Sequence, residues 1–278
     1  MKLQPPHCEV HLDHEPWRLR SGMMLNHSTD ELSPLIDFRN TLTLTEILDA
    51  RFYPRHCSGW DDSLFRHLIL SHIRQEDTIL DLGAGRGRLE QMNFRGLVKR
   101  VCGLDPGETV LTNPHLDEAK VGFAENIPWP NDVFDMVFSD NVIEHLLDPI
   151  DSFREVHRVL RPGGLFLVKT PNRYHYVAAT ASLTPYWFHQ WFNARRGNER
   201  HDTFPTVYRA NTRGRLRKVA ESAGLPVVDI IAIEGRPEYM RWTPLTYAFG
   251  LLYERIVNST DLLTPFRVVL LATFRKPK

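Results

Sequence analysis

The sequence has no excess of charge of either sign. Its 278 residues include 34 Lys and Arg and 34 Asp and Glu, so the formal net charge is zero. General nucleic-acid-binding proteins normally carry a basic excess. We therefore expect no nucleic acid among its partners.

Long apolar runs are also lacking. No stretch approaches the roughly 18 to 20 apolar residues that span a bilayer, and the N-terminal stretch MKLQPPHCEVHLDHE lacks the apolar centre of a signal peptide. The three cysteines, Cys8, Cys57 and Cys102, are odd in number and far apart, which favours a reduced protein over a disulfide framework. These absences predict a cytoplasmic protein without a transmembrane segment. Internal repeats and low-complexity tracts are absent as well.

From about residue 60, short apolar runs alternate with helical patterns. The apolar runs have the length of buried strands and cover 78–82, 100–105, 120–124, 134–139, 164–170, 227–235 and 267–275. Strands that alternate with helices predict a parallel sheet with both faces covered.

Five stretches have the apolar spacing of helices, and they cover 44–52, 63–73, 148–161, 212–225 and 245–257. In the second, Leu64, Leu68 and Ile73 share a face. Pro162-Gly163-Gly164 ends the third, and Gly224 stands where a C-terminal cap of the fourth belongs. The fifth is apolar nearly all round, so part of it must pack against another segment, a second subunit or a membrane surface; the first two are favoured.

The domain organisation predicted is an N-terminal extension over 1–55 and one domain over 56–278 with an insertion at 171–210. The extension holds His7, Cys8, His11 and His14 close together. No matched pair completes a metal site with them, so a solvated leader is favoured and no metal is expected.

Three glycines follow the first predicted strand, in the stretch ILDLGAGRGRLEQ at 79–91. Glycine costs backbone entropy, so a ligand that approaches the backbone is expected, with the loop opening toward a helix. Asp105 ends the next strand, where an acid can accept hydrogen bonds from ribose hydroxyls. The dinucleotide pattern G-x-G-x-x-G is broken by Arg88, which makes a dehydrogenase a distant alternative.

The pattern D-x-G-x-G-x-G over 81–87 instead resembles motif I of the class I S-adenosylmethionine-dependent methyltransferases. Later segments strengthen the resemblance: GLDPGE, GFAENIPWPNDVFDMVFSDNVIEHLLDP and VLRPGGLFLVKTPN follow the order and spacing of the type 11 methyltransferases. The resemblance covers about 75–170 well and 205–278 loosely. It implies a Rossmann-like, doubly wound α/β fold, with a seven-stranded mixed sheet whose last strand is antiparallel and an α-helical lid insertion.

The resemblance also implies S-adenosyl-L-methionine as cofactor, with methylation at oxygen as the favoured activity. Motif by motif, it assigns cofactor binding to Asp81, Gly83, Ala84, Gly85, Asp105, Pro106, Ala124, Glu125, Asp140 and Asn141. Family members often carry an acid for the adenine amino group at the position of Phe123, so that contact departs from the family pattern.

A hydroxyl acceptor must lose a proton, and His is the natural base near pH 7. His145, after the fourth predicted strand, resembles the histidine of the family's Glu-His pair. It is either this base or a packed histidine that orders the loop. Glu144 and Asp148 beside it do not amount to a metal site.

The insertion, taken over 171–218, holds nine Lys and Arg against Glu199 and Asp202, interleaved with nine Tyr, Trp and Phe. This pattern is typical of a lid that binds an anionic acceptor with ring faces, such as a phosphorylated or nucleotide-linked sugar. The alternative is a helical hairpin with solvated arginines. The acceptor-binding candidates are Tyr174, His175, Arg209 and Arg213.

Sequences with such a lid loosely resemble methyltransferases of bacterial polysaccharide biosynthesis. The predicted function is therefore methylation of a small or glycan-type acceptor by a monomer or homodimer, with peripheral membrane contact left open. The alternative is a catalytically silent S-adenosylmethionine-binding module that serves a protein partner.

Overall fold

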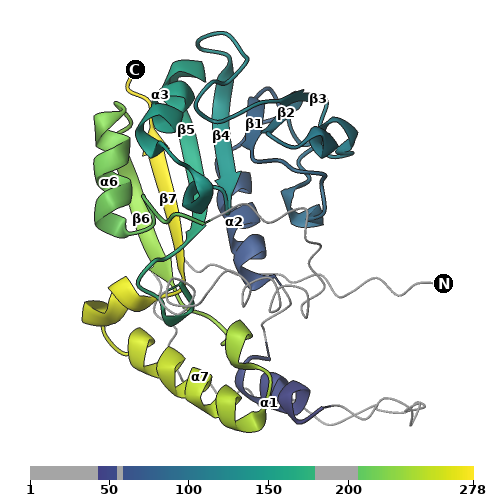
Figure 1. Cartoon of the computed structure of the whole chain (residues 1–278). Helices are drawn as coiled ribbons and strands as arrows, with labels where there is room; N and C mark the ends of the chain where they lie inside the picture. The colour runs from purple at the N-terminus through teal and green to yellow at the C-terminus, as the bar shows by residue number, and fades with distance from the viewer. Residues whose placement is uncertain (1–42, 55–58, 179–205) are drawn as a thin grey trace, which may run out of the picture.

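The computed structural model describes residues 43–54, 59–178 and 206–278. They form one seven-stranded sheet in the order β3-β2-β1-β4-β5-β7-β6 (Figure 1). The strands are β1 (Thr78–Leu82), β2 (Arg100–Asp105), β3 (Glu118–Val121), β4 (Phe134–Asp140), β5 (Leu160–Pro171), β6 (Val227–Ile233) and β7 (Val269–Arg275).

The sheet is mixed, as the resemblance to class I methyltransferases implies. The pairs β2–β3, β1–β2, β1–β4 and β4–β5 are parallel, whereas β7 is antiparallel to both β5 and β6. β6 therefore runs in the same direction as β5. The connection from β6 to β7 starts at the edge where β1, β4 and β5 have their carboxyl ends, and ligands of such sheets bind outside that edge.

That connection contains the short 3-10 helix η5 (Glu238–Met240), the helix α7 (Pro244–Asn258) and the 3-10 helix η6 (Asp261–Phe266). Figure 1 shows α7 beside the N-terminal helix α1 (Leu44–Phe52), beyond the end of the sheet to which β4 and β5 point. Among the described helices, none is long and apolar enough to cross a membrane.

Helices α2 (Trp60–Leu70), α3 (Pro149–Val159) and α6 (Arg213–Ser222) cover the sheet. α2 packs its predicted residues Leu64 and Leu68 against the core as partly buried side chains, while the neighbouring Phe65 and Ile69 are fully buried at the centre of the contact. The two buried residues are spaced i, i+4 on one side of the helix. α3 buries Phe153 and Val156 and α6 buries Leu216 and Ala220, as their spacing predicts, whereas the predicted Ile150 and Val219 are half-buried. Gly224, with φ of 76°, follows α6 as expected.

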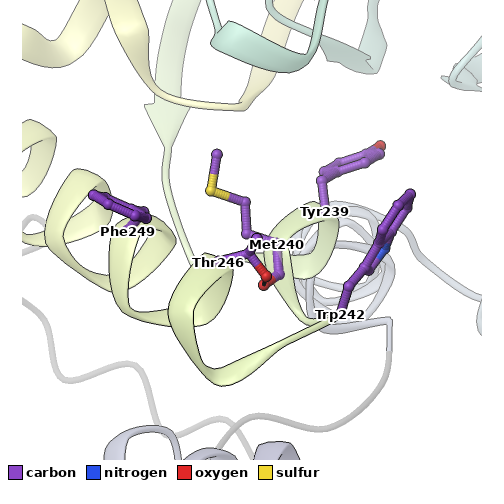
Figure 2. A pocket seen from close by; sticks show the side chains of 5 residues that line it. All are labelled: Tyr239, Met240, Trp242, Thr246 and Phe249. Carbon is purple, nitrogen blue, oxygen red and sulfur yellow. Dashed lines mark hydrogen bonds between the residues drawn. The ribbon is translucent and has the colours of Figure 1, made fainter.

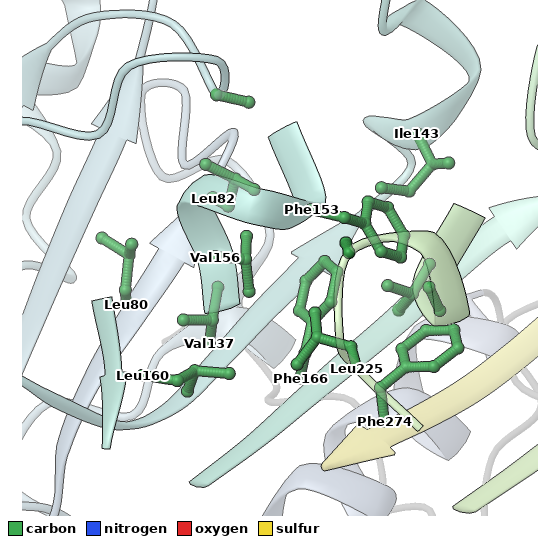
Figure 3. Close-up of a cluster of buried hydrophobic side chains, with 14 of the residues drawn as sticks. Leu80, Leu82, Val137, Ile143, Phe153, Val156, Leu160, Phe166, Leu225 and Phe274 are labelled. Atoms are coloured by element: carbon green, nitrogen blue, oxygen red, sulfur yellow. The ribbon is translucent and has the colours of Figure 1, made fainter. Parts of the chain in front are cut away.

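Each face of the sheet has its own apolar core. The core beneath α3 and α6 is drawn in Figure 3, where Phe153 lies between Phe166 and Phe274. The ring centroids of Phe153 and these partners are 5.0 and 5.6 Å apart, in edge-to-face geometry. The opposite core packs α2 against the sheet through Phe65 and Ile69.

The expectation of a helix after the glycine-rich loop is wrong. Residues 83–99 contain only the 3-10 helix η1 (Glu90–Met92). Gly83, Gly85 and Gly87 have φ of 87°, 49° and 72°, which a right-handed helix does not allow. In addition, Arg66 of α2 donates to the carbonyls of Gln91 and Asn93 at 2.7 and 2.8 Å. In a helix these carbonyls would instead accept from backbone N–H groups.

The third predicted helix ends earlier than its pattern suggests. α3 stops at Val159, and Leu160 already pairs with Phe134 of β4. β5 therefore includes Pro162-Gly163-Gly164, with a register shift between Phe134 and Met136 of β4. Gly163 and Gly164 therefore belong to β5 and do not mark the end of the helix.

Candidate active site

The glycine loop after β1 forms a cradle at the carboxyl edge of the sheet. A Cβ on Gly83 would lie 2.1 Å from Val142 Cγ2, and one on Gly87 would lie 2.3 Å from Asn113 Oδ1. These two glycines are therefore required by packing. A Cβ on Gly85 would meet nothing within 4 Å, so open space lies on the side of the loop that a ligand can approach.

Asp105, at the end of β2, ties the loops after β1 and β2 together. Its Oδ2 accepts from the backbone N–H of Gly85 at 3.0 Å, and its Oδ1 accepts from that of Gly107 at 2.8 Å. Pro106 lies in the loop after β2, between Asp105 and Gly107. A carboxylate has about four acceptor positions, so Asp105 retains capacity for ribose hydroxyls while it fixes the cradle.

Asp81 of β1 lies beneath the cradle and is buried. Burial raises the pKa of its carboxyl well above the ordinary range, and the nearby charges of Asp140 and Asp105 add to the shift. Three of the four acids predicted to hold the cofactor, Asp81, Asp105 and Asp140, therefore converge at the ends of adjacent strands. Their mutual repulsion favours a cationic or hydrogen-bond-donating ligand.

Asp140, at the end of β4, has two buried carboxyl oxygens: Oδ1 lies 3.0 Å from the ammonium of Lys169, and Oδ2 has no hydrogen-bond partner among the described residues. Burial raises the pKa of Asp140 to about 7, and the nearby ammonium of Lys169 offsets this only in part. Buried acceptors without partners are unusual. They fit a ligand that brings both an amine and a positive sulfur, as S-adenosylmethionine does.

Lys169 of β5 is fully buried and gathers acids from two elements. Its Nζ lies 3.0 Å from Asp140 Oδ1 in an ion pair, and 3.1 Å from Asp61 Oδ2 of α2, and it also contacts Asp62. Burial opposes its charge, but the attraction of Asp140, Asp61 and Asp62 outweighs burial and raises the pKa of Lys169. This cluster holds the start of α2 against the site.

Asn141 follows Asp140 in the left-handed region, with φ of 54°. Its N–H donates to Lys169 O at 2.9 Å. Few residues other than glycine adopt this conformation, and it tends to occur at functional sites. The turn directs the chain away from β4 at the place where the methyl group is expected.

On the adenine side, the predicted residues follow β3. Ala124 is buried in the core beneath α3 and α6, and Glu125 is half-buried. Phe123 is 66% exposed. The structure therefore offers an aromatic side chain, and no carboxylate, at the position where relatives often carry an acid.

A cavity of about 270 Å³ opens beside Asn141, at the carboxyl ends of β4 and β5. We call it the acceptor cavity. It is lined by Asp61, Asn141, Glu144, Pro171, Asn172, His175, Val177, Ala178, Tyr208, Tyr239, Val268 and Val269.

Glu144 contributes a buried carboxyl group to this cavity. It belongs to the 3-10 helix η3 (Ile143–His145) and accepts from Thr170 Oγ1 at 3.0 Å, while Asn211 donates to the same Thr170 oxygen at 2.6 Å. Burial raises the pKa of Glu144 to about 7. A carboxyl group that titrates near neutrality at a cavity wall is a candidate for proton transfer.

His175, one of the residues assigned to acceptor binding, also lines the cavity. Its Nδ1 accepts from Val177 N at 3.4 Å, and burial lowers its pKa to about 3, so the imidazole is neutral and its Nε2 carries the proton. This Nε2 makes no hydrogen bond, although Glu234 Oε2 lies 3.5 Å away.

His145 is half-buried at the end of η3 and does not line the acceptor cavity. Asp148, nearby in sequence, accepts from Ile150 N and Asp151 N as the N-cap of α3. Within the part of the chain that the structure describes, no group of three His, Cys, Asp or Glu lies close enough to hold a metal ion. The cluster of His7, Cys8, His11 and His14 lies outside the described residues.

The remaining acceptor candidates do not line the cavity. Tyr174 is 57% exposed, Arg209 donates to Leu147 O at 2.5 Å, and Arg213 is exposed at the first turn of α6. Residues 179–205 of the predicted lid lie outside the described residues. The helical-lid prediction therefore remains a prediction.

Sequence reasoning missed several residues of the site. Lys169 carried a usable signal, since a charge inside the apolar run LFLVKT must be paired. Tyr208 belongs to the aromatic residues of 171–218 that the sequence links to acceptor binding, although it was not singled out. Tyr239 carried no signal, because it reaches the cavity from a segment far away in the sequence.

Comparison with known proteins agrees with this geometry. The sequence model of the family described as "Methyltransferase domain" matches residues 80–168. A ubiquinone biosynthesis O-methyltransferase of Methylobacterium sp. is 31% identical over 205 residues, spanning 69% of this chain and 79% of that protein. The corresponding enzyme of Pseudomonas paraeruginosa is 32% identical over 194 residues, spanning 65% of this chain and 75% of that protein.

Among solved structures, a chain from the complex of the Haloferax volcanii Trm112 methyltransferase activator with a methyltransferase has a similar fold. Its TM-score is 0.54 at 20% identity, over 84% of this chain and 96% of that chain. The protein is thus an enzyme of the methyltransferase class. It belongs to the class I S-adenosylmethionine-dependent methyltransferases, with S-adenosylmethionine as its cofactor.

Proposed function

We propose that the enzyme methylates a hydroxyl oxygen of a small, uncharged acceptor held in the acceptor cavity. The observation that carries the proposal is the position of this cavity, beside Asn141 and with Glu144 in its wall. The two bacterial relatives above are named O-methyltransferases, which supports oxygen as the methylated atom.

The charge of the cavity wall supports an uncharged acceptor. Asp61 and Glu144 line it, and its described lining residues include no Lys or Arg. An anionic head group would therefore be repelled here, in contrast to the expectation drawn from the arginines of 171–218. A phenol and a neutral sugar both satisfy this requirement.

Glu144 is proposed as the group that removes the acceptor proton. When bound, S-adenosylmethionine supplies an electrophilic methyl group. The side chains of this enzyme then have to position the hydroxyl and take its proton. A base works best with a pKa near the working pH, and that of Glu144 is about 7. His145, favoured by the sequence, is the second candidate.

The test is a transfer assay with methyl-labelled S-adenosylmethionine and a panel of catechols and neutral sugars. Glu144→Gln keeps the shape that Thr170 contacts, and it should lower kcat by about 10²- to 10⁴-fold while cofactor affinity stays unchanged. His145→Ala is the matched comparison. Loss of turnover in His145→Ala alone would assign the base to His145.

A different outcome would favour the silent binding module. In that case the enzyme binds S-adenosylmethionine tightly by calorimetry, yet no hydroxyl acceptor in the panel is methylated.

A further inference from the structure

A second hollow adjoins the acceptor cavity on the outside of α7. It has a volume of about 370 Å³ and is lined by Tyr239, Met240, Trp242, Thr246 and Phe249. We call it the α7 groove. Figure 2 shows Tyr239 and Trp242 on one side, Phe249 on the other, and Met240 and Thr246 between them.

The two hollows share one side chain. Tyr239 of η5 lines both the acceptor cavity and the α7 groove. One ligand can therefore place a head group beside Glu144 and continue past Tyr239 along α7. The path starts at the carboxyl edge of the sheet, because the β6–β7 connection that carries η5 and α7 leaves from that edge.

The groove is apolar, unlike the cavity. The hydroxyl of Thr246, one of its few polar groups, lies 2.9 Å from Met240 O and is used within the start of α7. Trp242 and Phe249 are 59% and 60% exposed. Such exposure of two large aromatic side chains in one hollow is typical of a binding surface.

The groove is built by close packing and is not a gap between loosely placed elements. A Cβ on Gly250 would lie 2.5 Å from Pro237 Cβ and 3.0 Å from Met240 Cβ. Only glycine lets α7 approach η5 so closely. α7 is further fixed by Thr243, whose side chain caps it together with that of Thr246.

From these observations we infer that the acceptor is an amphiphile, whose hydroxylated head occupies the acceptor cavity and whose apolar chain lies in the α7 groove over Tyr239. This inference rests on the proposed function for its head group. It assigns the groove to the substrate chain, and a second copy of the enzyme or a lipid surface then becomes an alternative to be tested.

The probes are catechol, 4-butylcatechol and 4-octylcatechol, titrated by calorimetry into the full-length enzyme with S-adenosylhomocysteine present. Affinity should increase about two- to fourfold for each methylene that enters the groove. In Phe249→Ser this gain should shrink, while the affinity for catechol itself stays unchanged. Leu262→Ser is the matched control, since Leu262 is 85% exposed and lies outside the groove.

Affinity that does not depend on chain length, or that depends on it equally in Phe249→Ser, would overturn the inference. It would also be overturned if the Phe249→Ser variant lost a concentration-dependent dimer by sedimentation, or lost binding to phosphatidylcholine vesicles by flotation, without losing the chain-length effect.

The same series separates this inference from the proposed function. If binding depends on chain length but no methylation occurs, the inference about the groove holds and the proposed O-methylation of these head groups is wrong. If catechol is methylated, and neither the rate nor the affinity changes when an alkyl chain is added, the proposed function holds and the groove does not bind the substrate chain.

Discussion

The side chain of Lys169 is fully buried. A change in its charge should therefore strongly affect the free energy of unfolding. Its ammonium holds Asp140 of β4 and Asp61 of α2 together. Taking one member from a buried ion cluster leaves the others uncompensated. Lys169→Met should therefore lower the free energy of unfolding by about 3 to 5 kcal/mol, measured by urea denaturation.

Arg154→Met is the control for that change. Arg154 pairs with Asp151 at the exposed surface of α3, at 2.8 Å, where an ion pair contributes roughly 0.5 kcal/mol or less. Equal effects of the two substitutions would show that the Lys169 cluster does not stabilise the fold.

Asp105 orders the glycine loop, and the prediction that it also accepts hydrogen bonds from the cofactor ribose can be tested. Asp105→Ala should weaken S-adenosylmethionine binding by about 1.5 to 3 kcal/mol, the range for hydrogen bonds to a charged group, as measured by calorimetry. Asp117→Ala is matched to it, because Asp117 also accepts from a backbone N–H, that of Val101 at 2.9 Å. Asp117 precedes β3, at the opposite edge of the sheet. Equal losses in both variants would contradict a direct role for Asp105.

At the scale of elements, α1 and α7 are joined through one buried acid. Asp49 of α1 accepts from Tyr247 of α7 at 3.0 Å and from Arg236 at 3.2 Å, and it also contacts Arg241. Asp49→Ala would leave the buried Arg236 without this partner, and should cost about 3 kcal/mol in thermal or urea unfolding.

Glu46→Ala is the comparison on the same helix. Glu46 belongs to the exposed capping box of α1 with Thr43, and a lost cap costs about 1 kcal/mol. If Asp49→Ala costs no more than Glu46→Ala, then α1 does not depend on its contact with α7. The predicted boundary at residue 55 falls between these two interacting helices.

The sequence predicts the elements better than their contacts. The strand runs and the helix 44–52 follow from local spacing, which sequence displays directly. The packing of α1 on α7 depends on Asp49. The local sequence predicts a solvated acid there, because its partners Tyr247 and Arg236 lie 198 and 187 residues away in the sequence.

The site divides in the same way. The cradle and Asp105 follow from motif spacing. The acceptor cavity depends on side chains from six separate segments of the chain, so no local sequence pattern indicates it. The helix expected after Gly87 is not formed, and the sequence itself gives a local reason, namely three glycines in five positions.

For the molecule as a whole, buried acids set the dependence of stability on pH. Burial raises the pKa of Glu144 to about 7 and that of Glu234 to about 8, above their values in the unfolded chain. Between the unfolded value of 4.5 and these raised values, the folded state therefore binds more protons than the unfolded state. The stability that these groups contribute is present at low pH and is lost as the pH rises through 7 to 8.

His175 acts in the opposite sense, because its pKa is lowered to about 3 by burial. Its contribution is lost as the pH falls below about 6.5, its unfolded value. Between pH 6.5 and 8 only the acids matter among these three groups. The unfolding midpoint in urea should therefore fall over this range, and Glu234→Gln should flatten the fall. A midpoint that rises from pH 6.5 to 8 would refute this account.

The same Glu234 has a second consequence. Its Oε2 accepts from Val268 N at 2.9 Å, and these are the first and last residues of the connection between β6 and β7. Residues 234–268 thus form a loop whose two ends are held together by this hydrogen bond, and it starts at the carboxyl edge of the sheet. The family model matches a different part of the chain, residues 80–168. A protein engineer could treat this loop as a cassette: exchanging it between relatives would graft a new specificity and leave the cofactor machinery in place.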